Sequence, residues 1–372
     1  MIPVSQPSVG ELERAYLLDA FDSGWISSHG EYLGKAEGLL RSIGEVQHAA
    51  VANNGTTALH LALLALGIGA GDEVVIPSLS YVATLNAVLY VGAIPVIVDV
   101  DPATWCIDPV AAEQAVSSRT RAILAVDLYG CPADYEALGH IAHGHNLFVI
   151  ADAAESLGAA VGDRQVGGLA DVTTLSFFGN KIATSGEGGA VLTDHDWVDE
   201  RVRRLRNQGN HPTRRYHHDI LGYNYRMTNL AAAVLSAQLE RLPELVANRV
   251  RVFEAYRQLL NGHGVTTQAP GPHVRMTPWL YTVTCDGYEA DQRDALMAKL
   301  LERGFDSRPV FQPLETMPYF SPGLQHSRAG RVASRVSSSG ISLPTFPDLR
   351  VEDIQRIADA VATAMREIET QN

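Results

Sequence analysis

The first half of the chain alternates helical stretches with short apolar runs rich in Val and Ile. Four such runs cover residues 73–77, 94–100, 121–126 and 147–152, each bounded by Gly, Pro or Asp. Between them, segments such as TALHLALLALGIG and ATLNAVLYVG have the apolar spacing of helices. Continuous short apolar runs are typical of strands buried on both faces, so the pattern predicts an α/β fold with a mostly parallel central sheet flanked by helices.

The second half has a different texture. A loop, NQGNHPTRRYHHDILGYNYRMTN, is too long for a plain connector. The helical segment LAAAVLSAQLERL follows it and is expected to end near Pro243. Further on come a helix RVFEAYRQLL, a strand at 280–285, a helix DQRDALMAKLLERG and a final helix from Val351. We therefore predict a large domain over residues 1–243 and a smaller C-terminal α+β domain over 244–372, with the N-terminal segment able to pack against the small domain.

Composition narrows the classes of function. The chain has 372 residues, 46% of them hydrophobic, and a formal net charge of -13 without a basic run. This charge argues against nucleic acid or an anionic membrane as the main partner. The N-terminus lacks the features of a signal peptide, and no apolar run reaches the length of a membrane span. We expect a cytoplasmic enzyme-sized protein.

Cysteine and histidine usage gives no sign of a metal site. Cys106, Cys131 and Cys285 are odd in number and far apart, which fits reduced thiols better than disulfides or zinc ligands. The loop histidines His217 and His218, with His211, match no common ligand spacing. We expect no bound metal.

Three lysines are the candidates for lysine-based chemistry. Lys35 and Lys299 lie in amphipathic helical stretches, where a solvated side chain is expected. Lys181 follows the apolar run LSFFGN and precedes IATSGEGG, a loop of small residues that lets the backbone approach a ligand. A loop lysine taken alone is most often a surface charge, so the assignment depends on its companions.

A Schiff-base site for a pyridine cofactor also needs an acid opposite the ring nitrogen, an anion cradle and a flat partner for the ring. Asp152 ends a predicted strand, where ligands of parallel sheets gather, although it can equally cap the next helix. The segment 54–57, NGTT, opens a helix and offers free N–H groups to a phosphate, or is ordinary capping. Tyr81 follows a strand end and can stack on the ring, or is simply core.

Over nearly its full length the chain resembles the DegT/DnrJ/EryC1/StrS aminotransferase family, and within it the GDP-perosamine synthases. The family has fold type I of the pyridoxal-phosphate enzymes, which is aspartate aminotransferase-like, so the resemblance makes 1–243 the cofactor-binding domain. The matching segments are GWISSHGEYLGKAE, NNGTTALHLALLALGIGAGDEVVIPSLSYVATLNAVLYVGAIPVIVDVDP, DLYG, ADAAESLGA, SFFGNKIATSGEGG, RNQGNHPTRRYHHDILGYNYRMTNLAAA and SRPVFQPLETMPY.

The resemblance implies roles around the cofactor ring. Lys181 is implied as the residue that carries pyridoxal 5'-phosphate and moves protons, and Asp152 as the partner of its pyridine nitrogen. Tyr81 corresponds to the stacking residue. Glu155 corresponds to the group near the ring hydroxyl, a position often held by Gln in relatives.

The resemblance also implies a phosphate site shared between two chains. Gly55, Thr56 and Ser176 correspond to phosphate-binding residues. Asn224, in the GYNYR stretch, resembles the asparagine that reaches the neighbouring subunit's phosphate. A homodimer with active sites at the subunit interface is therefore implied.

The implied reaction moves an amino group from an amino acid, L-glutamate by family habit, to a keto sugar attached to a nucleotide. Some relatives carry His at the lysine position and dehydrate sugars, so Lys181 favours transamination. The acceptor implied is GDP-4-keto-6-deoxymannose, which gives GDP-perosamine. Arg308 is a candidate for the substrate diphosphate, because a planar guanidinium suits phosphate oxygens. None of the arginines of 201–215 stands out.

One departure keeps the sugar open. Perosamine synthases commonly read SRPVFHP, whereas this chain has Gln312, which cannot titrate near neutrality. A 3-keto sugar, a dTDP- or UDP-linked sugar, or a keto cyclitol of antibiotic biosynthesis stays possible. A noncatalytic sensor with this fold is disfavoured because every expected cofactor group is present. A nicotinamide enzyme is disfavoured because GIGAGDE follows a helix, unlike the strand-turn-helix fingerprint.

Overall fold

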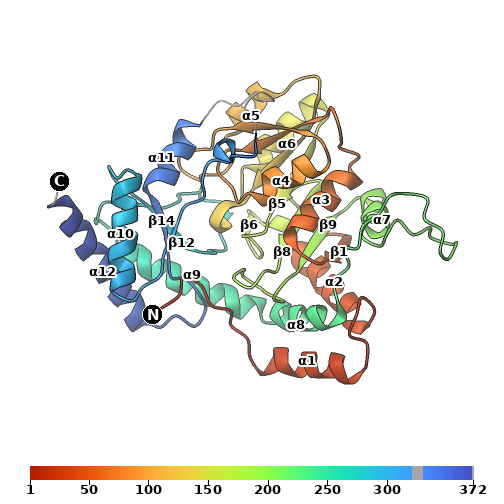
Figure 1. The fold of residues 1–372 in the computed structure, drawn as a ribbon, viewed down its shortest axis with the longest axis horizontal. Coiled ribbons are helices and arrows are strands. Elements are labelled where there is room, and N and C mark those ends of the chain that lie inside the picture. The colour runs from red at the N-terminus through yellow and green to blue at the C-terminus, as the bar shows by residue number, and fades with distance from the viewer. Residues whose placement is uncertain (321–329, 371–372) are drawn as a thin grey trace.

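The computed structural model describes residues 1–320 and 330–370 (Figure 1). Within these ranges the chain forms a seven-stranded sheet of order β1-β9-β8-β5-β4-β2-β3. β9 pairs antiparallel with both neighbours, and the pairs from β8 to β3 are parallel, which confirms the mostly parallel sheet. The strands are β1 (His48–Ala52), β2 (Glu73–Pro77), β3 (Ile94–Val98), β4 (Thr120–Val126), β5 (Phe148–Asp152), β8 (Val172–Ser176) and β9 (Gly189–Thr193).

Helices cover this sheet, as the alternating pattern predicts (Figure 1). α3 packs against β8 and β9 and also contacts α4 and α7. β2 is buried along its whole length, because both faces of the sheet are covered. The helices of this part are α1 (Glu11–Asp22), α2 (Glu31–Gly44), α3 (Gly55–Ala65), α4 (Ala83–Tyr90), α5 (Pro109–Ala115), α6 (Tyr135–His145), α7 (Asp196–Leu205) and α8 (Asn229–Glu240), with short 3-10 turns η1 (Leu128–Gly130) and η2 (Val166–Gly168).

The helix expected to end near Pro243 does so, and Pro243 itself lies in the first turn of the next helix. α8 stops at Glu240, and α9 (Leu242–Leu259) starts two residues later with Pro243 in its first turn. The missing N–H of a proline costs nothing there, because the first turn of a helix has no intrahelical acceptor for it. The expected helix RVFEAYRQLL is therefore the C-terminal part of a longer α9.

A second hydrophobic core lies in the C-terminal part, around an antiparallel sheet of order β10-β12-β14-β13. The first core includes Leu242 and the second includes Val252, so the change of core falls within α9. The division at 243/244 stays a prediction. The elements here are β10 (Val265–Thr266), β12 (Tyr281–Cys285), β13 (Arg308–Pro309), β14 (Gly340–Leu343), α10 (Ala290–Glu302), α11 (Arg331–Ser339), α12 (Val351–Glu369) and the turn η3 (Leu314–Thr316), while β6 (Ala160–Val161), β7 (Arg164–Gln165) and β11 (Val274–Arg275) form a small separate sheet.

The N-terminal residues contact the C-terminal part of the chain. The Ile2 N–H donates to the Gly304 carbonyl at 2.8 Å, and the Asp306 N–H donates to the Ile2 carbonyl at 2.9 Å. The Thr345 N–H donates to the Val4 carbonyl at 2.8 Å. In Figure 1 this end of the chain lies beside α9 and α12.

Two further expectations from the sequence concern membrane-spanning helices and disulfide bonds. In the part of the chain that the structure describes, no helix has the length and apolar character needed to cross a membrane. The three cysteines are buried and unpaired with one another.

Candidate active site

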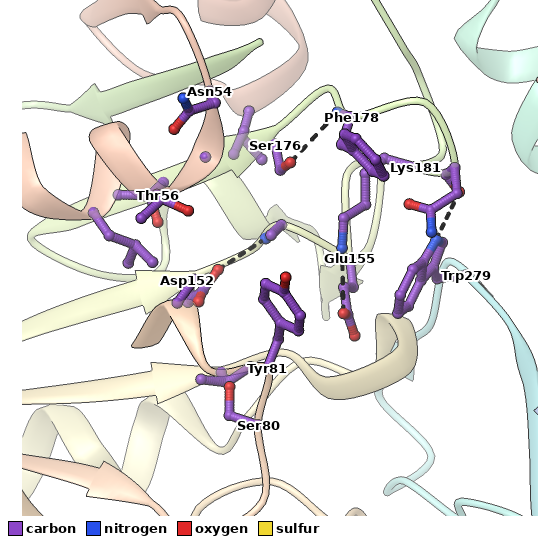
Figure 2. Close-up of a pocket in the computed structure, with 18 of the residues that line it drawn as sticks. Asn54, Thr56, Ser80, Tyr81, Asp152, Glu155, Ser176, Phe178, Lys181 and Trp279 are labelled. Atoms are coloured by element: carbon purple, nitrogen blue, oxygen red, sulfur yellow. Dashed lines mark hydrogen bonds and ion pairs between the residues drawn. The ribbon is translucent and has the colours of Figure 1, made fainter. Parts of the chain in front are cut away.

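A cavity of about 570 Å³ opens at the carboxyl ends of the central strands, beside β5 and β8. This is where a mostly parallel sheet collects ligands. Figure 2 shows its side chains converging from the start of α3, the end of β5, the loop after β2 and the loop after β8. Eight of the predicted residues line it: Gly55, Thr56, Tyr81, Asp152, Glu155, Ser176, Lys181 and Arg308.

Lys181 differs from the other two lysines by its burial. Its side chain is 12% exposed, against 34% for Lys35 and 23% for Lys299, which form ion pairs with Glu240 and Glu367. Its Nζ lies 3.3 Å from Oε1 of Glu155 and 3.9 Å from the centroid of the Trp279 ring. The expected surface lysines are thus only partly exposed, and Lys181 is an amine held inside the cavity.

Asp152 lies at the last position of β5, almost fully buried. Its Oδ2 accepts a hydrogen bond from Thr84 Oγ1 at 3.1 Å, and its Oδ1 accepts one from the Ala154 N–H at 3.3 Å. Burial raises the pKa of Asp152, and the nearby Lys181 charge and these two hydrogen bonds oppose that rise. A cationic N–H facing this carboxyl group would favour its ionised form further.

Glu155 is the anionic partner of Lys181. Its Oε2 accepts a hydrogen bond of 2.7 Å from the Tyr129 N–H, while Oε1 faces Lys181. Burial raises the pKa of Glu155, and the Lys181 charge acts against it. Tyr129 adopts φ 54° in the DLYG turn, which places its N–H towards Glu155.

The start of α3 and the end of β8 form a tight cradle. Asn54 caps the helix by accepting the Thr57 N–H at 2.9 Å, which leaves the N–H groups of Gly55 and Thr56 outside the cap. A Cβ on Gly55 would lie 2.8 Å from Cβ and 3.1 Å from Oγ of Ser176. The cradle therefore consists of a bare helix N-terminus beside a serine hydroxyl, which suits an anion.

Tyr81, Trp279 and Phe311 line the cavity as an aromatic wall, of which only Tyr81 was predicted from the sequence. Phe311 stacks on Tyr129 with centroids 5.5 Å apart, tilts against Tyr81 at 5.7 Å and lies 6.4 Å from Trp279. Trp279 comes from the segment before β12, about a hundred residues from Lys181, so no local pattern announces it. Phe311 is the aromatic residue of the SRPVFQP segment, so its place in that segment could have identified it.

Two predicted residues do not line the cavity. Asn224 is exposed, in a bridge with Asn207. Gln312 is also exposed, next to Phe311. Their expected roles stay predictions.

Thr84 was not predicted as a site residue. Its place three residues after Tyr81, on the first turn of α4, was the signal that could have pointed to a second polar group.

Comparisons with known proteins show what the whole chain is similar to. Residues 7–362 match the model of the DegT/DnrJ/EryC1/StrS aminotransferase family. The chain is 43% identical over 364 residues to a GDP-perosamine synthase of Caulobacter vibrioides, covering 97% of both chains, and 40% identical to one of Escherichia coli O157:H7, again covering 97% of both. The crystal structure of the aminotransferase TlmJ from Streptoalloteichus hindustanus superposes with a TM-score of 0.93 at 29% identity, covering 99% of this chain and 100% of that one.

The chain belongs to the DegT/DnrJ/EryC1/StrS aminotransferase family. It is a pyridoxal-phosphate-dependent aminotransferase with fold type I, as the sequence predicts. The cavity of this family member fits the cofactor: the cradle is bare where the phosphate needs room, a carboxyl group ends β5, and one buried amine projects between them.

Proposed function

We propose that this aminotransferase moves the amino group of L-glutamate to GDP-4-keto-6-deoxymannose and so makes GDP-perosamine. The observation that carries the proposal is similarity along the whole chain to GDP-perosamine synthases of three organisms, at 38 to 43% identity over 97% of this chain. A keto sugar attached to a nucleotide is also the acceptor that the sequence motifs imply.

The residues of the cavity support a division of labour. Bound pyridoxal phosphate supplies an electron sink for the bond broken at the substrate's reacting carbon. Lys181 Nζ carries the cofactor and moves the proton, and Glu155 holds that amine in place from 3.3 Å. Asp152 holds the proton on the ring nitrogen, which strengthens the sink.

Other groups bind and orient. The helix start at Gly55 and Thr56, with Ser176, holds the phosphate, and Tyr81 covers the ring. Arg308, on β13 at the edge of the cavity, pairs with the diphosphate of the nucleotide. The aromatic wall excludes water from the reacting groups.

The active unit of the proposal is a homodimer. Tyr81 is 58% exposed and Tyr90 59% exposed in the single chain, although both line the cavity. A second chain carrying Asn224 would cover them and complete the phosphate site. Mixing Lys181→Ala protein with Asn224→Ala protein tests this, because a hybrid dimer regains one site with both residues intact. Activity that never exceeds that of the separate variants would contradict a shared site.

The substrate proposal is tested with a panel of GDP-, dTDP- and UDP-linked keto sugars and keto cyclitols, each supplied with glutamate. We expect the highest kcat/KM for the GDP-linked 4-keto-6-deoxymannose. A preference for a 3-keto sugar or a cyclitol would overturn the sugar while leaving the aminotransferase assignment intact. The exposed Gln312, where relatives commonly have His, is the reason for including those arms.

A further inference from the structure

Arg249 is a charged group placed inside the protein. It lies on α9 with 1% of its surface exposed. Burial lowers its pKa to about 10, so the guanidinium remains charged at neutral pH. No carboxylate pairs with it among the residues that the structure describes. Because a buried charge is costly, its hydrogen bonds have to compensate for lost water.

Those hydrogen bonds go to main-chain carbonyls of three distant segments. One terminal nitrogen, Nη1, donates to the Trp279 carbonyl at 2.6 Å and to the Thr345 carbonyl at 3.3 Å. The other, Nη2, donates to the Lys181 carbonyl at 3.2 Å. Two of the three acceptors therefore belong to residues of the active-site cavity.

Trp279 and Lys181 also contact each other directly. The Trp279 indole Nε1 donates to the Asn180 carbonyl at 2.7 Å, one residue before Lys181, and Lys181 Nζ lies over the indole ring (Figure 2). The Lys181 loop has no regular secondary structure to hold it. Arg249 therefore forms hydrogen bonds with the main-chain carbonyls of both Lys181 and Trp279.

We propose that Arg249 is a positioning residue, which fixes Lys181 over the Trp279 ring and joins this pair to the C-terminal core through Thr345. The inference rests on the proposed role of Lys181 as the cofactor lysine. The hydrogen bonds by which Arg249 holds Lys181 and Trp279 belong to this chain alone and do not depend on that role.

The experiment uses the small number of lysines. Cofactor-free protein is treated with an amine-acetylating reagent, and labelling rates of Lys181, Lys35 and Lys299 are read by peptide mass spectrometry. We expect Arg249→Met to raise the rate of Lys181 relative to Lys299 by about tenfold, the change that one hydrogen bond from a charged donor makes. Arg293→Met is the matched control, because Arg293 is also buried and donates to a carbonyl, that of Ser337, away from the cavity.

A second variant covers the case in which Arg249→Met does not fold. Arg249→Lys keeps the charge, but a compact ammonium group cannot span the Trp279 and Lys181 carbonyls as the guanidinium does. We expect the labelling ratio to rise in Arg249→Lys while circular dichroism shows native structure. We also expect the loaded variant to lose kcat with little change in the KM for glutamate.

An unchanged Lys181 ratio in folded Arg249→Lys, or an equal rise in the Arg293 control, would overturn the proposal. Because labelling needs neither cofactor nor sugar, a failed substrate panel leaves this result standing. A failure of the substrate proposal can therefore be distinguished from a failure of the Arg249 proposal.

Discussion

Thr84 donates a hydrogen bond of 3.1 Å to Asp152, the carboxyl group that ends β5. Both side chains are buried, and the Thr84 hydroxyl is also 2.8 Å from that of Ser80. This donor is one of the influences that keep the pKa of Asp152 from rising further in its buried position. The acidity of the proposed ring-nitrogen partner is thus set partly by a threonine on the neighbouring helix α4.

Thr84→Val keeps the shape of the side chain and removes the donor. The pKa of Asp152 then rises, so a smaller fraction is ionised at a given pH. We expect the acidic limb of the pH–rate profile to move upward by about one unit, as the loss of one hydrogen bond implies. Thr173→Val is the control, because its buried hydroxyl donates to the Val166 carbonyl instead. Equal shifts in the two variants would contradict the role of Thr84.

Lys181→Ala removes the proposed base together with the covalent link to the cofactor. We expect the half-reaction with glutamate, followed by the visible absorbance of the cofactor, to slow by a factor of about 10² to 10⁴ or more. Lys299→Ala removes only an ion pair with Glu367 and should leave this rate unchanged. Folding of both variants is checked by circular dichroism. Substantial half-reaction activity in Lys181→Ala would refute the assignment.

Asp127 makes folding stability depend on pH. It is fully buried and accepts hydrogen bonds from the Ala133 N–H, the Tyr135 hydroxyl and the Ser156 hydroxyl. Burial nevertheless raises its pKa to about 7. Between its ordinary pKa near 4 and this value, the folded protein holds a proton that the unfolded chain has lost. The free energy of unfolding contributed by Asp127 therefore falls as pH rises through this window and levels off above it.

Asp127→Asn removes this titration while keeping the shape, since its amide can accept from Ala133 and Tyr135 and donate to Ser156. We expect the free energy of unfolding of the variant to increase, relative to that of the native protein, as the pH rises from 4 to 7. The increase is at most about 4 kcal/mol, at about 1.36 kcal/mol for each pKa unit. Urea unfolding across this range measures the difference. A constant difference at all pH values would show that Asp127 does not titrate there.

Replacing Gly130 or Gly139 by alanine should change the stability of the protein in opposite directions. Gly130 has φ 96°, and a Cβ there would overlap the Thr277 carbonyl oxygen, in the segment before β12 that carries Trp279. Gly139 lies within α6 with open space around it. In thermal unfolding, we expect Gly130→Ala to lower the free energy of unfolding by about 2 kcal/mol or more, and Gly139→Ala to raise it by about 0.5 to 1 kcal/mol. The same sign for both would contradict this reading of the two sites.

Much of the fold was predictable because its signals are local. The apolar run at 73–77 is strand β2, and the run at 147–152 contains β5 with Asp152 at its end. The cradle was found from the NGTT segment for the same reason, since capping depends on neighbours in sequence. Arg249 and Trp279 could not be found this way, because their contacts with Lys181 are 68 and about a hundred residues away along the chain. The end of α8 near Pro243 was predictable because proline marks a helix boundary, whereas the first two turns of α9 after it were not recognised.

The contacts of residues 2–4 with the segment around Gly304 and with Thr345 have a consequence for biosynthesis. A ribosome delivers the first of these segments about three hundred residues before the others. The early segment must wait, without its partners, while the central sheet forms. Docking of this segment is therefore a late step, and a chain released before residue 304 lacks every one of these hydrogen-bond partners.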